Sequence, residues 1–185
     1  MNQPIRILFI LFVFFVSSSS NANSKEFVPL WGTTYYGMSL KEVIASVPNA
    51  QTTLNIIKPS FLKPNEQALA KLNNIEIAGE TFNVWFIFSN DKLSYVTLIL
   101  LPKMNDTDAL MTDDYFTSLY THYSQLLIAK YGNPVKNTRQ DYAPSNIHLW
   151  NTQWIFGLTS IELNEDKIQL EITYSAKYAD DLRKL

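Results

Sequence analysis

Two apolar segments joined by a short polar turn dictate a β-sheet in the middle of the chain. In Thr81 to Phe88, alternate positions carry phenylalanine or valine: Phe82, Val84, Phe86 and Phe88. Side chains of a β-strand alternate between its two faces, so these residues share one face. The turn Ser89-Asn90-Asp91-Lys92 leads to a second apolar segment, Leu93 to Leu101, and Ile75 to Glu80 provides an earlier strand and turn. We therefore predict an antiparallel meander.

The opposite face of this predicted hairpin is apolar as well. If Val96, Leu98 and Leu100 join the phenylalanines in the core, the other face carries Trp85, Ile87, Tyr95, Thr97 and Ile99. Two explanations are open: a helix of the same chain covers this face, or a partner protein does. Because the sequence predicts two helices for one sheet, we expect a helix to cover it.

The first predicted helix runs from about Ser39 to Val47. Ser39 and Glu42 have the spacing of a capping box, in which each side chain satisfies a free backbone amide at the helix start. The apolar residues recur at helical spacing and form one stripe, namely Leu40, Val43, Ile44 and Val47. Pro48 and Asn49 end the helix.

The second and longest predicted helix begins at Thr112 or Asp113 and ends at Lys130-Tyr131, before Gly132-Asn133-Pro134. Its apolar face consists of residues at 3.6-residue spacing, which are Phe116, Leu119, Tyr120, Tyr123 and Leu127. We expect this face to pack against the sheet.

The rest of the chain completes an α+β pattern. Further strands are expected at Thr52 to Ile57, Ile147 to Asn151, Trp154 to Leu163 and, after the turn Asn164-Glu165-Asp166, Lys167 to Tyr174. Asn65 to Leu72 is compatible with a helical turn or with the beginning of a strand, and Val135 to Pro144 is polar. We therefore expect an α+β fold in which helices pack on an antiparallel sheet. Residues 37–101 and 112–174 each contain a helix followed by a meander, which suggests an internal duplication.

The first residues predict an exported protein. A start with one positive charge, Arg6, precedes an uninterrupted apolar run from Ile7 to Val16. As a helix this run spans about 15 Å, which is too short for the ~30 Å hydrocarbon core of a bilayer. It is typical of a signal peptide, and the small residues Ser20 and Ala22 predict cleavage after Ala22. The short core and the flanking serines disfavour an uncleaved anchor or a buried N-terminal helix.

Residues 1–22 are thus the expected signal peptide, and residues 23–185 a single α+β domain that is periplasmic or secreted. The chain has no cysteine, which excludes disulfides, thiolate metal sites and thiol nucleophiles. It also excludes a lipidated cysteine, so no stable membrane anchor is expected after cleavage. The formal net charge is −2, and lysine and arginine form no cluster, so neither a nucleic acid nor a polybasic membrane contact is expected.

The sequence contains no catalytic or cofactor motif, and we predict no catalytic residue, no metal site and no cofactor. The chain has two histidines, His122 and His148, and neither has a carboxylate at metal-ligand spacing. One acidic cluster can bind a cation: Asp106, Asp108, Asp113 and Asp114. A simpler interpretation is a solvated loop whose negative charges stabilise the N-terminus of the following helix.

The segment Gly37-Met38-Ser39-Leu40-Lys41-Glu42-Val43 resembles the helix start of the small outer-membrane-assembly lipoproteins called SmpA/OmlA. The order of helix and meander is similar to that of the β-lactamase inhibitor proteins, which are built from two such units. The resemblance implies a protein that presents a sheet or loop surface to another protein. The chain differs from the lipoproteins in its greater length and in lacking the lipidated cysteine.

These observations favour an exported protein that binds another envelope or secreted protein, as an inhibitor, immunity factor or envelope adaptor. The expected contact residues are aromatic or apolar: Trp31, Tyr35, Tyr36, Trp85, Ile87 and Tyr95. Trp31, Tyr35 and Tyr36 are equally compatible with a core plug. Two alternatives stay open, a carrier of a small apolar ligand in the concavity of the sheet and an envelope hydrolase that uses His122 or His148.

Overall fold

The computed structural model describes residues 27–53, 62–101, 113–142, 147–166 and 169–177. The expected signal peptide lies outside the described residues, as do Thr112, Asp106, Asp108 and residues 54–57 of the strand expected at Thr52 to Ile57. Within the described part, helices and an antiparallel sheet form an α+β fold, as predicted.

The elements alternate between a helix and a group of strands. The first group is α1 (Leu40–Ser46), β1 (Gln51–Thr52), β2 (Glu66–Ile77), β3 (Glu80–Ser89) and β4 (Lys92–Leu100). The second group is α2 (Asp113–Tyr131), β5 (Lys136–Tyr142), β6 (Ile147–Phe156), β7 (Thr159–Asp166) and β8 (Gln169–Ala176).

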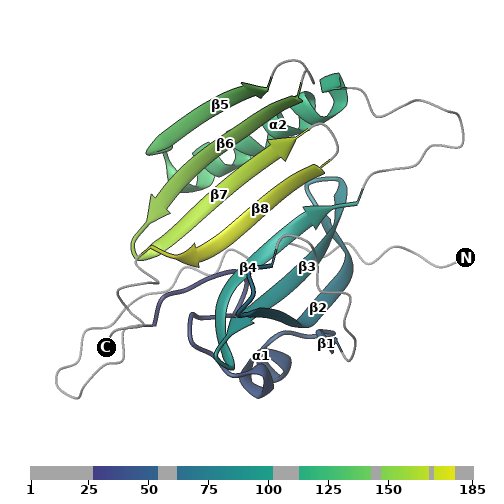
Figure 1. The fold of residues 1–185 in the computed structure, drawn as a ribbon, viewed down its shortest axis with the longest axis vertical. Helices are drawn as coiled ribbons and strands as arrows, with labels where there is room; N and C mark the ends of the chain where they lie inside the picture. Colours follow the sequence, from purple (N-terminus) through teal and green to yellow (C-terminus); the bar gives the residue numbers. More distant parts are fainter. Residues whose placement is uncertain (1–26, 54–61, 102–112, 143–146, 167–168, 178–185) are drawn as a thin grey trace, which may run out of the picture.

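All strands belong to one eight-stranded sheet with the order β1-β2-β3-β4-β8-β7-β6-β5 (Figure 1). The two groups meet where β4 pairs antiparallel with β8, from Tyr95 opposite Ser175 to Ile99 opposite Glu171. β4 and β8 are each the last strand of their group. From either edge of the sheet to its centre, the strands therefore follow one another in chain order.

The predicted capping box begins α1. The Ser39 backbone N–H donates to Glu42 Oε2 at 2.6 Å, and the Glu42 backbone N–H donates to Ser39 Oγ at 3.4 Å. Val43 and Val47 are buried, and Leu40 and Ile44 pack partly buried against the same core. A seven-residue helix depends on such packing, because short isolated helices are marginal in water.

The long helix α2 also packs as predicted. Its buried residues are Phe116, Tyr120, Tyr123 and Leu127, with Leu119 partly buried beside them. The Tyr123 ring lies edge-on to Phe82 of β3 at 5.4 Å, and its hydroxyl donates to the carbonyl of Ile77 at 2.6 Å. The Tyr120 hydroxyl bonds to that of Thr152 on β6. The helix therefore contacts strands of both groups.

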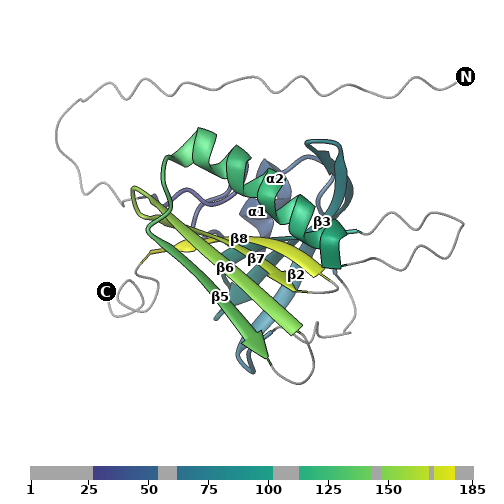
Figure 2. The same ribbon diagram turned by 90° about the horizontal axis from the view of Figure 1, so that it is seen from above.

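Both helices lie on the same side of the sheet (Figure 2). Their buried residues share one core with Phe82, Val84 and Phe86 of β3 and with Ile161 and Leu163 of β7. The register confirms the predicted division of faces, because Val84 lies opposite Leu98 and Trp85 lies opposite Thr97. The expectation that a helix covers the Trp85 face is wrong for α1 and α2. The apolar stripes of α1 and α2 both pack on the other face, which carries the phenylalanines of β3.

The sequence left two stretches unassigned, and the structure places both in strands. The ambiguous segment Asn65 to Leu72 is strand from Glu66 onward and continues to Ile77. The polar segment after α2 forms β5, which pairs along its whole length with β6 as an edge strand of the sheet. Polar residues suit such a position, because an edge strand has one row of backbone groups facing away from the sheet.

The predicted strand Trp154 to Leu163 is in fact a hairpin. β6 continues through Trp154 to Phe156, the chain turns at Gly157-Leu158, and β7 begins at Thr159, so Asn164 to Asp166 are strand rather than turn. Gly157 has a φ of 60°, a value that glycine adopts without steric cost. The predicted break between Asn151 and Trp154 does not exist.

Among the described residues, no helix has the length and apolar character required to cross a membrane.

Replacing Ser39 by alanine should remove the cap of α1 and lower the free energy of unfolding by about 1 kcal/mol. Ser39→Asn keeps a side-chain acceptor at the same position and is the matched control. It should change the free energy of unfolding by only a few tenths of a kcal/mol. Urea unfolding followed by circular dichroism measures both variants. Equal losses for alanine and asparagine would show that the cap does not stabilise the domain.

Candidate functional site

The face of the sheet opposite to α1 and α2, here called the helix-free face, has a continuous row of side chains across seven strands. Backbone pairing places the following residues side by side in this row: Lys71, Trp85, Thr97, Thr173, Glu162, Gln153 and Lys136. A parallel row contains Ile87, Tyr95, Ser175, Ser160 and Ile155. The face is aromatic and apolar on β3 and β4 and polar on β6 to β8.

The polar half of the helix-free face is connected by hydrogen bonds between strands. The Thr173 hydroxyl donates to Glu171 Oε1 at 2.7 Å, and the hydroxyls of Thr97 and Thr173 are 2.9 Å apart. Because Thr173 has one hydroxyl proton, Thr97 is the donor in the second bond. Gln153 Nε2 donates to Ser160 Oγ at 2.8 Å and to Glu162 Oε1 at 3.2 Å. These bonds hold the side chains in fixed positions on the sheet.

The aromatic half of the face is centred on Trp85. The Trp85 side chain is half-buried, and Lys71 Nζ lies 5.6 Å from the centre of its ring, within range of a cation–π interaction. Ile87 has no exposed surface, whereas Tyr95 opposite it is half-buried. Of the three predicted contact residues on this face, Trp85 and Tyr95 therefore have accessible surface and Ile87 serves packing.

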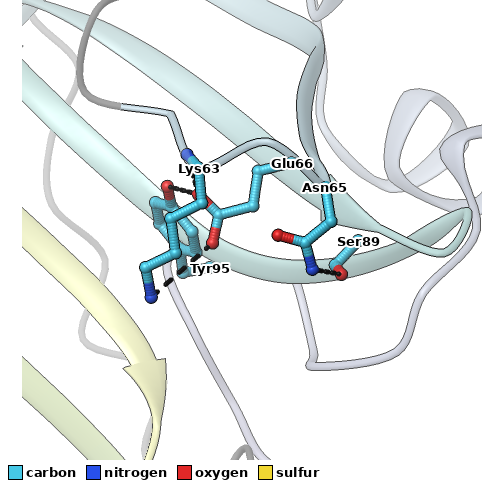
Figure 3. A network of polar contacts seen from close by, with 5 residues as sticks. All are labelled: Lys63, Asn65, Glu66, Ser89 and Tyr95. Carbon is cyan, nitrogen blue, oxygen red and sulfur yellow. Dashed lines mark hydrogen bonds and ion pairs between the residues drawn. The ribbon is translucent and has the colours of Figure 1, made fainter.

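Tyr95 is held by a polar network at the start of β2 (Figure 3). Glu66 is buried, and its Oε2 accepts from the Tyr95 hydroxyl at 2.9 Å and from the Lys63 backbone N–H at 3.0 Å. Lys63 Nζ lies 4.0 Å from Glu66 Oε1, and Asn65 Nδ2 donates to Ser89 Oγ at 3.3 Å. The network ties the beginning of β2 to β3 and β4 and fixes the Tyr95 ring on the helix-free face.

The electrostatic surroundings of Tyr95 are negative. Burial, the hydrogen bond to Glu66 and the charges of Glu66 and Glu171 together raise the pKa of Tyr95 well above its ordinary value of 10.0. Glu66 lies on β2 and Glu171 on β8, so carboxylates from both groups of strands act on this hydroxyl.

The second predicted aromatic group lies elsewhere. The Trp31 ring is 6.3 Å from Phe86, a residue of the helix-covered face, and Trp31 and Tyr36 pack partly buried against the core. Tyr35 is half-buried, and its ring meets that of Phe27 at 5.5 Å. Trp31 and Tyr36 thus contribute to the core, and the structure does not bring them together with Trp85 and Tyr95.

The segment that carries Trp31 links the two halves of the sheet at one end. The Gly37 backbone N–H donates to the carbonyl of Leu93 on β4, and the Thr159 hydroxyl of β7 donates to the carbonyl of Pro29. Val28, Leu30 and Thr34 are buried. Residues 28–37 therefore belong to the folded domain from the start of its described part.

The two histidines lie on different elements of the fold. His122 lies exposed on α2, where its ring contacts Tyr123 at 5.4 Å, and His148 belongs to β6. Within the described ranges, no group of three or more histidine, aspartate or glutamate residues is arranged to hold a metal ion.

Comparison with known proteins does not place the chain in a family: no family model matches it, and neither does a curated protein or a solved structure.

Sequence reasoning identified Trp85 and Tyr95 but missed the acidic and amide side chains of β6 and β7 on the same face. Glu162, Asn164 and Gln153 reach this face because β6 and β7 form a hairpin at Gly157. That glycine was the available signal, since an isolated glycine within a strand pattern often marks a turn or bulge.

The variant Tyr95→Phe should lower the free energy of unfolding by about 1–3 kcal/mol at neutral pH, because buried Glu66 loses a donor. It should also reduce the loss of stability at alkaline pH. Folding raises the pKa of Tyr95, so above pH 10 the unfolded chain loses the Tyr95 proton while the folded protein keeps it. The contribution of Tyr95 to the free energy of unfolding therefore decreases as the pH rises further. Urea titrations between pH 8 and pH 11 measure both effects. An identical alkaline slope in the wild type and the variant would contradict the assignment.

Proposed function

We propose that this protein is exported from the cytoplasm and acts by binding another protein, in the periplasm or outside the cell, through its helix-free face. The observation that carries the proposal is the placement of both helices on one side, which leaves Trp85 and Tyr95 accessible on the other. Large aromatic side chains are frequent anchors of protein interfaces, because they bury much apolar area with few rotatable bonds.

The hydrogen-bonded polar half of the face supports the same function. Side chains that are already fixed, such as Thr173, Glu171 and Gln153, lose little conformational freedom when a partner binds. Protein interfaces combine an apolar, often aromatic part with a polar part, and the helix-free face has an aromatic half and a polar half. The roles of inhibitor, immunity factor and envelope adaptor are all compatible with such a surface.

Export is part of the proposal and is supported by the sequence. The apolar run from Ile7 to Val16 and the small residues before position 23 are typical of a cleaved signal peptide. With cleavage after Ala22, the mature chain begins shortly before Val28, which is buried in the domain.

We also propose that residues 37–101 and 112–174 derive from one duplicated unit of a helix and a meander. The order of elements supports this, since α1 precedes β1–β4 and α2 precedes β5–β8. The strand order supports it too, because equivalent strands β4 and β8 meet at the centre of the sheet. The resemblance to the β-lactamase inhibitor proteins, which consist of two such units, belongs to the same proposal.

Replacing Trp85 by alanine should weaken partner binding at least about tenfold while the domain stays folded. Tagged residues 23–185 as wild type, Trp85→Ala and Leu126→Ala are used to capture proteins from envelope and secreted fractions, followed by mass spectrometry. Leu126 is an exposed apolar residue of α2, on the opposite side of the sheet, and its truncation is the matched control. The expected result is one dominant protein held by the wild type and by Leu126→Ala.

Melting temperatures of the three proteins complete the experiment. A large decrease for Trp85→Ala would show that Trp85 serves core packing. Equal capture by all three proteins would exclude the helix-free face as the contact surface, and no specific capture by the wild type would direct attention to ligand and hydrolase assays.

A further inference from the structure

The two edges of the sheet differ in how well they can pair with a further strand. At one edge, β1 covers only Ala70 and Lys71 of β2, and the pairing of β2 with β3 has two register shifts. At the other edge, β5 pairs with β6 over its whole length without a register shift. Among the described residues, no strand pairs with the outer side of β5 (Figure 1). The β5 edge is therefore the more regular template for strand pairing.

The side chains of β5 leave this edge accessible. The long helix α2 packs on β6, β7 and β8. Within β5, residues 136–141 are exposed except for half-buried Thr138. An edge strand has a row of backbone N–H and C=O groups that can bond to a strand of another chain.

Two opposite charges have fixed positions on β5. Arg139 and Asp141 lie on the same face, because they are two residues apart in a strand. Arg139 Nε donates to Asp141 Oδ1 at 2.8 Å, and the guanidinium carbon lies 4.9 Å from the ring centre of Trp150, the neighbour of Arg139 on β6. The Arg139 side chain is nevertheless 44% exposed and that of Asp141 61% exposed. A second strand can therefore reach both charges.

We propose that the β5 edges of two copies of this chain pair antiparallel about a two-fold axis at Gln140, which joins the two sheets into one. This inference goes beyond the proposed function and does not depend on it. Such an axis is perpendicular to the sheet and keeps each residue on the same face in both copies. In every symmetric register, one residue of β5 therefore lies opposite its own copy.

Within β5, one such register brings opposite charges together. With Gln140 on the axis, Arg139 of each copy lies opposite Asp141 of the other, and Thr138 lies opposite Tyr142. With Arg139 on the axis, two guanidinium groups oppose each other, and with Asp141 on the axis, two carboxylates do. Charges on an edge strand usually prevent pairing, because like charges on facing positions repel. In β5 they disfavour these two registers and favour the register centred on Gln140.

The contact within each chain is compatible with pairing. A guanidinium group has five N–H donors and a carboxylate about four acceptor positions, so Arg139 and Asp141 can bind each other and also their counterparts in the second copy. The paired segment is short, and we expect a weak dimer that forms as the concentration rises. The axis places both helix-free faces on the same side of the joined sheet, so the dimer presents this face twice.

Charge reversal tests the pairing, with sedimentation equilibrium of residues 23–185 up to millimolar concentration as the measurement. The wild type should form dimers. Arg139→Asp and Asp141→Arg should each weaken dimerisation at least about tenfold, because each places like charges opposite one another twice. Lys41→Asp reverses an exposed charge on α1 and should leave dimerisation unchanged. A wild type that stays monomeric, or equal weakening by Lys41→Asp, would overturn the proposal.

A mixture of the two single variants separates charge pairing from a loss of folding. Arg139→Asp has aspartate at both positions and Asp141→Arg has arginine at both, so a mixed pair restores opposite charges across the axis. We expect each variant alone to stay largely monomeric and the mixture to dimerise nearly as well as the wild type. A mixture that dimerises no better than its components would contradict the proposed register.

Single cysteines introduced into this cysteine-free chain test the position of the axis. At Gln140 the two Cα atoms are expected about 4.5–5.5 Å apart, a separation that a disulfide spans. Lys136→Cys places an exposed thiol on the same face, with about 27 Å between the two copies, and is the matched control. Under mild oxidation, Gln140→Cys should form linked dimers at least about tenfold faster than Lys136→Cys. Equal rates would show that the two edges do not pair in this way.

Discussion

The pairing of β4 with β8 is the interaction on which the rest of the structure depends. It joins two groups of strands into one sheet, and it places Thr97 beside Thr173 and Ile99 beside Glu171. Because the sheet is continuous, α2 can pack on strands of both groups through Tyr123 and Tyr120, and one core serves the whole domain. A chain without cysteine has no disulfide to join its halves, so backbone pairing and this core must hold them together.

The two faces of this sheet carry different chemistry. The helix-covered face is filled by large apolar side chains such as Phe82, Phe86 and Trp154, which have no exposed surface. On the helix-free face, polar side chains bind one another from strand to strand, and Glu66 fixes Tyr95. The apolar face stabilises the fold by burial, whereas the polar network leaves carboxylate and aromatic groups in fixed positions where a partner can reach them.

The sequence predicted the elements whose local signals agree with their packing. The Ser39–Glu42 capping box, the alternating phenylalanines of β3 and the apolar stripe of α2 all specify one structure, and each is present. It did not predict β5, because an edge strand with polar residues on both sides lacks the alternation of a half-buried strand. For the site, the pattern identified the aromatic half around Trp85. The acidic half depends on the β6–β7 hairpin and on cross-strand neighbours, and the side on which the helices pack is a tertiary property that the local pattern does not encode.

The measurement that most directly tests the central claim is the native-state labelling of single cysteines introduced into this cysteine-free chain. Glu162→Cys and Asn164→Cys place a thiol on the helix-free face, Leu163→Cys places one in the core, and Thr121→Cys provides an exposed reference on α2. With a maleimide reagent, we predict that the thiols at positions 162 and 164 react, more slowly than the thiol at the exposed position 121, while the thiol at position 163 is protected. Protection of positions 162 and 164 in the isolated, monomeric protein would contradict the account, because the face assigned to a partner would then be covered by the chain itself.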